Sequence, residues 1–281
     1  MNISQLINSG SKILKKNQIP THLLDSELFL SNVLKKSREY LLISHEGNVS
    51  EHHKILFNRL IQRRIKKEPV AYIFKKKEFW SKDFLVNKNT LIPRPETELL
   101  IDVVVKYFKY KKNMNILDVG TGSGCIILTL VDEIKKSRGI GIDISKKAIS
   151  IASENLKRFK LEKKVKLLNR SIDQIFGYKF DLVVSNPPYI CSHEINNLSE
   201  DIRKYEPRIA LDGGNDGLDV VKKVIYKSTN ILKRKGMLAL EIGHGQYKKV
   251  SQILKLKGFK DKFLVKDYQN NIRCILTTLE K

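Results

Sequence analysis

Apolar runs of strand length alternate with stretches of helical periodicity from Met114 to the end of the sequence, and this alternation restricts the fold more than any other feature. Repeated strand–helix–strand units indicate a mostly parallel sheet with helices on both faces. We therefore predict an α/β domain in this part of the chain. The expected strands are 116–119, 139–142, 165–168, 180–184, 237–242, 262–265 and 274–279, and the expected helices are 123–135, 146–159, 217–233 and 246–256.

The last two expected strands have no helix between them. Asn270 and Asn271 lie there instead, and a polar pair of this kind favours a tight turn. These strands are therefore expected to form an antiparallel hairpin at the edge of the sheet. The predicted fold class is α/β, with a Rossmann-like sheet of seven strands and a small helical bundle before it.

The bundle is predicted from the beginning of the chain, where helical periodicity replaces the alternation. Apolar side chains recur at helical spacing within 3–14, 23–34 and 55–65, and Pro69 should end the last helix near Lys67. Short β-type runs follow within 78–86 and predict a hairpin. The expected domains are a helical domain (1–76), a hairpin linker (77–95) and the α/β domain (96–281).

Composition excludes several classes of protein. The chain is 41% hydrophobic, enough for a core, but no apolar run approaches the roughly 20 residues that span a bilayer. Its first residues lack a signal-peptide pattern. The three cysteines, Cys125, Cys191 and Cys274, are far apart and form no CxxC pair, which disfavours a disulfide framework and a zinc ribbon. We expect a cytoplasmic protein without membrane or metal.

The net charge is strongly positive, because 53 Lys and Arg exceed 30 Asp and Glu by 23. Two interpretations are open: a solvated lysine-rich surface, or a surface that attracts an acidic partner such as RNA or a ribosome-associated protein. The lysines are scattered along the chain, which favours the first interpretation.

A glycine-rich turn follows the first expected strand of the α/β domain. Asp118-Val119-Gly120-Thr121-Gly122-Ser123-Gly124 leads directly into a helix. Glycines allow a tight turn and a close approach of the backbone to a ligand. The next apolar run ends at Asp143, where a carboxylate can accept hydrogen bonds from two ribose hydroxyls.

This turn fits neither the dinucleotide fingerprint GxGxxG nor a P-loop, because Cys125 stands at the third glycine position and no Gly-Lys-Ser/Thr occurs. It resembles the cofactor loop of class I S-adenosylmethionine methyltransferases. That cofactor is a cationic sulfonium with a ribose and no phosphate. Asp118 and Asp143 would supply the negative charge that a basic protein needs to hold it.

The expected strand 180–184 runs on to Ser185 and ends in Asn186-Pro187-Pro188-Tyr189, the most informative segment. An amide nitrogen is a poor nucleophile because its lone pair is delocalised, so its NH2 must be held for methylation. The Asn186 side-chain oxygen and the Pro187 carbonyl can each accept one N–H, and the prolines keep them aimed. Tyr189 offers an aromatic wall for a planar group.

The segment resembles the [Asn/Asp/Ser]-Pro-Pro-[aromatic] motif of amino-methyltransferases that act on planar nitrogen. Pro93-Arg94-Pro95-Glu96-Thr97-Glu98, with Glu68-Pro69-Val70-Ala71-Tyr72, narrows the resemblance to the release-factor glutamine N5-methyltransferase family (HemK/PrmC). Members methylate the glutamine of the Gly-Gly-Gln loop in class I peptide-chain release factors with S-adenosyl-L-methionine. The resemblance extends over nearly the whole chain and includes Glu206-Pro207, Asp216-Gly217-Leu218 and Leu240-Glu241-Ile242-Gly243 with Gln246.

The resemblance implies a set of site residues. Catalysis is assigned to Asn186, Pro187 and Tyr189, and substrate binding to these three and Pro188. The helical domain is expected to dock the protein substrate. With Asp118 from the charge argument and Ile172 as a wall for the adenine, the expected cofactor contacts are Asp118, Gly120, Thr121, Gly122, Ser123, Gly124, Asp143, Ile172 and Asn186.

The chain departs from the family pattern in two places: the turn before the hairpin, and the stretch expected near the adenine of the cofactor. Phe74-Lys75-Lys76-Lys77 stands where a glycine commonly precedes the hairpin, and Asn169-Arg170-Ser171-Ile172 stands where an acidic and a bulky residue commonly follow the third strand. Arg94 either holds the linker to the catalytic domain or touches substrate.

Three other functions remain open from the residues. A ribosomal-protein glutamine methyltransferase shares Asn-Pro-Pro-Tyr but usually lacks the Pro-Arg-Pro-Glu-Thr-Glu run. A DNA or RNA adenine N6-methyltransferase would use the same four residues, although about 75 helical residues are a poor target-recognition domain. A basic ribosome- or RNA-binding protein would bind no cofactor. We expect release factors as partners, and no stable nucleic acid.

Overall fold

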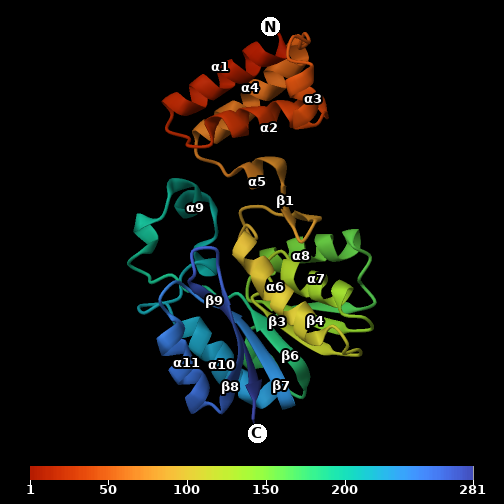
Figure 1. The fold of residues 1–281 in the computed structure, drawn as a ribbon, viewed down its shortest axis with the longest axis vertical. Coiled ribbons are helices and arrows are strands. Elements are labelled where there is room, and N and C mark those ends of the chain that lie inside the picture. The colour runs from red at the N-terminus through yellow and green to blue at the C-terminus, as the bar shows by residue number, and fades with distance from the viewer. Residues whose placement is uncertain (281) are drawn as a thin grey trace. The chain divides into compact units, whose positions relative to one another are not determined.

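Seven strands form one sheet in the order β5-β4-β3-β6-β7-β9-β8, in a computed structural model that describes residues 1–280 (Figure 1). The first five strands of this order are parallel, and β9 and β8 are antiparallel at the edge. The predicted fold class and edge hairpin are therefore confirmed. The strands are β3 (Asn115–Val119), β4 (Arg138–Asp143), β5 (Val165–Asn169), β6 (Phe180–Ser185), β7 (Leu232–Glu241), β8 (Phe259–Lys266) and β9 (Ile272–Leu279).

Helices cover both faces of the sheet, as the alternating pattern predicts. Successive residues of a strand point to opposite faces, so Ile116 packs in one core and Leu117 in the other. The first core is covered by α6 and α7, with α8 beside them, and the second by α10 and α11 (Figure 1). These helices are α6 (Pro95–Phe108), α7 (Cys125–Glu133), α8 (Lys146–Arg158), α10 (Asp219–Ile231) and α11 (Tyr247–Leu256).

The strand order places β3 between β4 and β6, so the chain continues to opposite sides of β3. In open α/β sheets, ligands bind beyond the carboxyl ends of the strands at such a switch point. The glycine loop, Asp143 and Asn186 follow β3, β4 and β6, and the topology therefore brings them to one edge.

A short hairpin, β1 (Lys76–Phe79) and β2 (Lys82–Leu85), belongs to the same compact unit as the sheet. Phe79 and Phe84 are buried in the first core. Immediately before the hairpin, Lys75 adopts a left-handed conformation with φ of 58°, a conformation that glycine adopts at lower cost. The turn before the hairpin is therefore made without a glycine.

The other compact unit contains Met1–Phe74 and, from later in the chain, Glu200–Tyr205. Its core contains Leu14, Phe29 and Phe57. The sequence predicted three of its helices and missed the short ones, α3, α5 and α9. The helices are α1 (Ile3–Lys16), α2 (His22–Leu34), α3 (Arg38–Ile43), α4 (Glu51–Ile65), α5 (Val70–Phe74) and α9 (Glu200–Tyr205).

The helix α9 is tied to this unit by a hydrogen bond of 2.8 Å from the Tyr205 hydroxyl to the carbonyl of Lys66. The segment after Asn-Pro-Pro-Tyr therefore contributes to the helical unit before the chain returns to the α/β unit. No helix within residues 1–280 is long and apolar enough to cross a membrane.

Candidate active site

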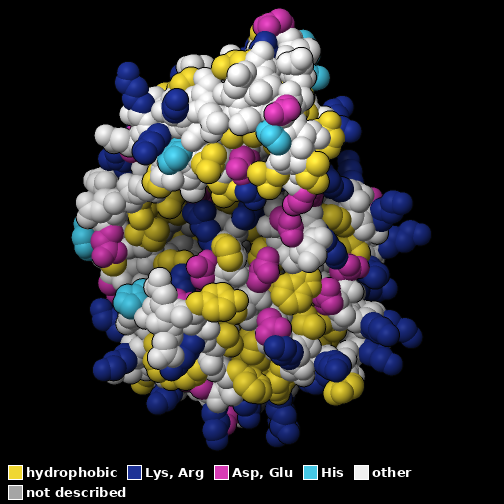
Figure 2. Space-filling model, turned by 45° about the horizontal axis from the view of Figure 1, so that its top comes forward, with side chains coloured by type: hydrophobic (Ala, Val, Ile, Leu, Met, Phe, Trp, Pro, Cys, Tyr) yellow, Lys and Arg dark blue, Asp and Glu magenta, His cyan; other side chains and the backbone are white. Residues whose placement is uncertain are grey.

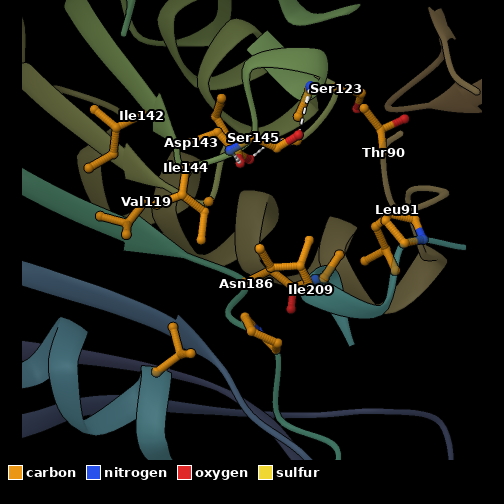
Figure 3. A pocket seen from close by; sticks show the side chains of 18 of the residues that line it. Thr90, Leu91, Val119, Ser123, Ile142, Asp143, Ile144, Ser145, Asn186 and Ile209 are labelled. Atoms are coloured by element: carbon orange, nitrogen blue, oxygen red, sulfur yellow. Dashed lines mark hydrogen bonds between the residues drawn. The ribbon is translucent and has the colours of Figure 1, made fainter. Parts of the chain in front are cut away.

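A cavity of about 260 Å³ lies in the α/β unit beyond the carboxyl ends of β3, β4 and β6. In the view of Figure 3, Val119, Ile142 and Ile144 lie on one side, Thr90 and Leu91 on the other, and Asn186 between them. Of the predicted site residues, those that line the cavity are Gly120, Thr121, Gly122, Ser123, Asp143, Ile172, Asn186 and Pro188. Asp118, Gly124, Pro187 and Tyr189 are not among the lining residues.

The glycine loop needs glycine for its backbone conformation. Gly120, Gly122 and Gly124 have φ of 75°, 57° and 83°, which side chains disfavour. Gly124 is the N-cap of α7, and the backbone N–H groups of Gly120 and Thr121 both donate to the carbonyl of Ile142 at 2.9 Å. The loop is thereby fixed to β4 and presents its backbone to the cavity.

Asp143 is the polar group at the tip of β4. Its carboxylate accepts hydrogen bonds from the backbone N–H of Gly122 at 3.0 Å and of Ser145 at 2.8 Å. Partial burial raises the pKa of Asp143, while these two hydrogen bonds lower it. Ser145 accepts from the N–H of Ala148 and is the N-cap of α8. The remaining lone pairs of Asp143 are available at the cavity.

Asp118 lies beneath the loop. It is fully buried, and its Oδ2 accepts a hydrogen bond of 2.6 Å from the Thr121 hydroxyl. Its Oδ1 has no hydrogen-bond partner within residues 1–280. Burial raises the pKa of Asp118 to about 7, and the charge of Asp143 adds to the rise. A buried carboxylate of this kind, behind residues that line the cavity, favours a positive charge nearby.

Asn186 is held by a side chain that the sequence did not single out. Its Nδ2 donates to the Thr97 hydroxyl oxygen at 3.0 Å, and that hydroxyl donates to Glu241 Oε2 at 2.7 Å. Thr97 lies in the first turn of α6, and Glu241 is the last residue of β7. Burial raises the pKa of Glu241, while the Thr97 hydroxyl, the charge of Arg273 and the Tyr189 hydroxyl lower it.

Tyr189 closes this network on its other side. Its hydroxyl lies 3.3 Å from Glu241 Oε1 and accepts a hydrogen bond of 3.0 Å from the Arg273 guanidinium. The guanidinium also lies over the Tyr189 ring, 5.4 Å from its centre. The hydroxyl therefore points to the network, and a role for the ring as a wall for substrate stays a prediction.

The segment after Asn186 is held by close backbone contacts. A Cβ on Gly213 would lie 2.8 Å from the carbonyl oxygen of Pro188, and one on Gly217 would lie 2.4 Å from that of Tyr189. The Gln246 side chain donates to the Tyr189 carbonyl at 2.9 Å. These contacts explain why the glycines and the glutamine accompany the Asn-Pro-Pro-Tyr segment.

Arg94 pairs with Glu206 at 2.5 Å, and the backbone N–H of Ile92 donates to the same carboxylate at 3.1 Å. Through these contacts the buried Glu206 carboxylate links the loop before α6 to the loop after α9. Both loops contribute residues to the cavity. Of the two roles open for Arg94, this contact fits that of holding the linker. Glu98 accepts a hydrogen bond of 2.9 Å from the backbone N–H of Trp80 in the hairpin.

The residues present fit S-adenosylmethionine. Asp143 offers acceptors suited to two ribose hydroxyls, Asp118 a buried negative charge, and the isoleucines of the cavity an apolar surface for a purine. Arg170, Ser171 and Ile172 line the cavity where the family commonly has an acidic and a bulky residue. No group of His, Cys, Asp and Glu able to hold a metal occurs in the part of the chain that the structure describes.

Two family models match the chain. The PrmC N-terminal domain matches residues 5–74, and a methyltransferase domain matches residues 110–241. A release factor glutamine methyltransferase of Clostridium acetobutylicum is 38% identical, over 98% of this chain and 98% of that protein. One of Fusobacterium nucleatum is also 38% identical, over 96% of this chain and 77% of that protein.

Solved structures agree on the fold of the α/β unit. A methyltransferase from Pyrococcus furiosus has a TM-score of 0.54 at 17% identity, covering 79% of this chain and 98% of that one. The ribosomal protein L11 methylase of Lactobacillus delbrueckii subsp. bulgaricus has a TM-score of 0.51 at 19% identity, covering 68% and 82%. At these identities the likeness supports the fold alone.

Proposed function

The chain belongs to the family of release factor glutamine methyltransferases, and we propose that it methylates the N5 amide of the glutamine in the Gly-Gly-Gln loop of class I peptide-chain release factors. Its methyl donor is S-adenosyl-L-methionine. The observation that supports the site assignment most strongly is the position of the Asn186 side chain. Its amide is hydrogen-bonded to Thr97 at the wall of the same cavity that contains the glycine loop and Asp143.

The cofactor supplies a methyl group made electrophilic by the neighbouring sulfonium. In our proposal Asp143 would accept hydrogen bonds from the ribose hydroxyls, and the loop from Gly120 to Gly124 would help to hold the cofactor. Asp118 stabilises the positive charge from beneath the loop, and Ile172 contacts the purine. Asn186 borders both the cofactor and the substrate glutamine.

The substrate amide needs two acceptors, because only a held NH2 directs its nitrogen lone pair at the methyl group. We assign these acceptors to Asn186 Oδ1 and the Pro187 carbonyl, with Pro188 and Tyr189 completing the substrate-binding segment. The bound donor would supply the methyl group with its carbon–sulfur bond breaking as the nitrogen–methyl bond forms, so that sulfur keeps the electron pair. The surplus amide proton then leaves to water, so no strong base is required.

The helical domain, predicted as 1–76, is proposed to dock the release factor, while 77–95 links it to the methyltransferase domain of 96–281. On the face shown in Figure 2, Lys and Arg side chains are spread over the surface with Asp and Glu among them. On this face, the distribution supports a basic surface with scattered charges rather than a single binding patch. A cytoplasmic location and the absence of a stable nucleic-acid partner remain part of this proposal.

The function is tested by incubating the protein with S-adenosylmethionine and a class I release factor, followed by mass spectrometry of the Gly-Gly-Gln peptide. We expect one added methyl group on the glutamine, and none on a factor in which alanine replaces it. Ribosomal proteins and adenine-containing nucleic acid are assayed in parallel. Methylation of either of these, with an unmodified release factor, would contradict the proposal.

Cofactor binding is expected to depend on pH through Asp118. Burial raises the pKa of this carboxyl to about 7, so it is largely ionised at pH 8 and largely protonated at pH 6. A cationic ligand prefers the ionised form. We therefore expect S-adenosylmethionine to bind about three- to tenfold more weakly at pH 6 than at pH 8, measured by calorimetry.

S-adenosylhomocysteine provides the matched control, because it has the same titratable groups and no sulfonium charge. Its affinity should change much less between pH 6 and pH 8. Asp118→Asn should remove the difference between the two ligands. An equal pH dependence for both ligands would show that Asp118 does not sense the sulfonium.

A further inference from the structure

We propose that Thr97 and Glu241 are positioning residues that fix which end of the Asn186 amide faces the substrate. The inference rests on the proposed function and extends it to two side chains outside the predicted site. Both are buried, Thr97 with 2% and Glu241 with 0% of its surface exposed. Thr97 also borders the cavity beside Asn186.

When Glu241 is ionised, the hydrogen bonds between these side chains can run in only one direction. A carboxylate accepts and does not donate, so the single proton of the Thr97 hydroxyl goes to Glu241 Oε2, 2.7 Å away. The hydroxyl oxygen is left with lone pairs toward Asn186. It therefore accepts from Asn186 Nδ2, 3.0 Å away, and would repel Oδ1.

The Tyr189 hydroxyl strengthens this direction. Because it accepts from the Arg273 guanidinium at 3.0 Å, its own proton is available to Glu241 Oε1, 3.3 Å away. Burial raises the pKa of Glu241, and the nearby positive charge of Arg273 opposes that rise together with the hydroxyls of Thr97 and Tyr189. The chain of donors thus converges on Glu241 from both sides.

The direction matters because the two ends of an asparagine amide have nearly the same shape and opposite hydrogen-bonding properties. With Nδ2 occupied by Thr97, Oδ1 is the end left for the substrate, and it can accept from the glutamine NH2. A reversed amide would place an NH2 against an NH2. Shape alone cannot prevent that reversal, whereas the Thr97 hydroxyl can.

A purely structural role would not require these groups. Burying a carboxylate costs free energy that apolar residues of similar volume would avoid. This part of β7 also accommodates buried apolar side chains, since Leu238 and Leu240 of the same strand are fully buried. The polar network lies where β7 ends beside the cavity, and there it can orient the Asn186 amide.

The experiment is a double-mutant cycle between Thr97→Val and Asn186→Ala. Methylation of a release factor is measured at saturating donor, and each rate is divided by the concentration of donor-binding sites titrated in the same sample. Unfolded protein then does not count. Thr97→Ser tests rescue by the hydroxyl, and Thr129→Val is the matched control. Thr129 is also a buried threonine, and its hydroxyl has no hydrogen-bond partner within residues 1–280.

We expect Thr97→Val to lower kcat about tenfold, with the KM for the release factor and the Kd for the donor changing less than about twofold. Thr97→Ser should recover most of the rate, and Thr129→Val should leave it unchanged. In the Asn186→Ala background, Thr97→Val should have almost no further effect, because the group it positions is gone.

Three results would overturn the inference: a Thr97→Val enzyme within about threefold of the wild-type kcat, a full additional loss in the Asn186→Ala background, or a loss of donor binding. The wild-type protein separates this from failure of the proposed function. If it methylates the release factor while Thr97→Val does so equally well, the function stands and the positioning role fails.

Discussion

Replacing Asn186 with alanine is expected to lower kcat by roughly 10²–10³-fold, because one of two fixed acceptors for the substrate amide is removed. The donor site should persist, since its glycine loop is held by β4 and Asp143 is held by the N–H groups of Gly122 and Ser145. We expect the Kd for S-adenosylmethionine to change less than about tenfold. Single-turnover methylation of a release factor and calorimetry with the donor measure the two effects separately.

Asn230→Ala is a suitable control, because Asn230 is an exposed asparagine near the end of α10 and does not line the cavity. It should leave both quantities unchanged. If Asn186→Ala lost donor binding in proportion to its rate, Asn186 would be a cofactor ligand above all. A rate within about threefold of wild type would remove it from catalysis altogether.

The sequence predicts the sheet well, because each strand is determined locally by its apolar run and by the turn residues that bound it. All seven predicted strands overlap observed ones, and Asn270, in the predicted turn, adopts a positive φ of 66° between β8 and β9. Because parallel strands share an edge for their carboxyl ends, the motifs after β3, β4 and β6 had to meet. The edge of the candidate site therefore follows from local patterns.

The groups behind that edge could not be predicted in the same way. Thr97 and Glu241 are 144 residues apart, and the Arg94–Glu206 pair joins residues 112 apart. No local period records such pairings. Thr97 occurs within a recognised motif, but only the structure shows that its hydroxyl faces Asn186. Three residues of the motif Pro-Arg-Pro-Glu-Thr-Glu therefore have different roles. Arg94 links two loops through Glu206, Thr97 accepts a hydrogen bond from Asn186, and Glu98 accepts one from the hairpin.

The short helix α9 was missed for a different physical reason. Its six residues are too few to show an amphipathic period, and an isolated helix of this length is unstable in water. Its tertiary contacts, such as that of Tyr205 with Lys66, stabilise it instead. Short elements of this kind depend on the rest of the fold and have little signal of their own.

Replacing Asp143 with alanine is expected to raise the Kd for S-adenosylmethionine by about 100-fold. Hydrogen bonds to a charged group contribute about 1.5–3 kcal/mol each, and the loss of two from the ribose would cost about 3 kcal/mol or more. The backbone N–H groups of Gly122 and Ser145 would also lose their acceptor, which should loosen the glycine loop. Calorimetry measures the affinity, and thermal unfolding without ligand measures the loosening.

Asp143 as a ribose ligand and Asp118 as a group that senses charge predict different selectivity between donor and product. The ribose is common to donor and product, so Asp143→Ala should weaken S-adenosylmethionine and S-adenosylhomocysteine by similar factors, whereas Asp118→Asn should weaken mainly the cationic donor. Asp102→Ala, which makes the same change in net charge at the Lys106 pair on α6, should affect neither ligand. A Kd for the donor within about threefold of wild type in Asp143→Ala would exclude the ribose assignment, because even one lost charged hydrogen bond should exceed that change.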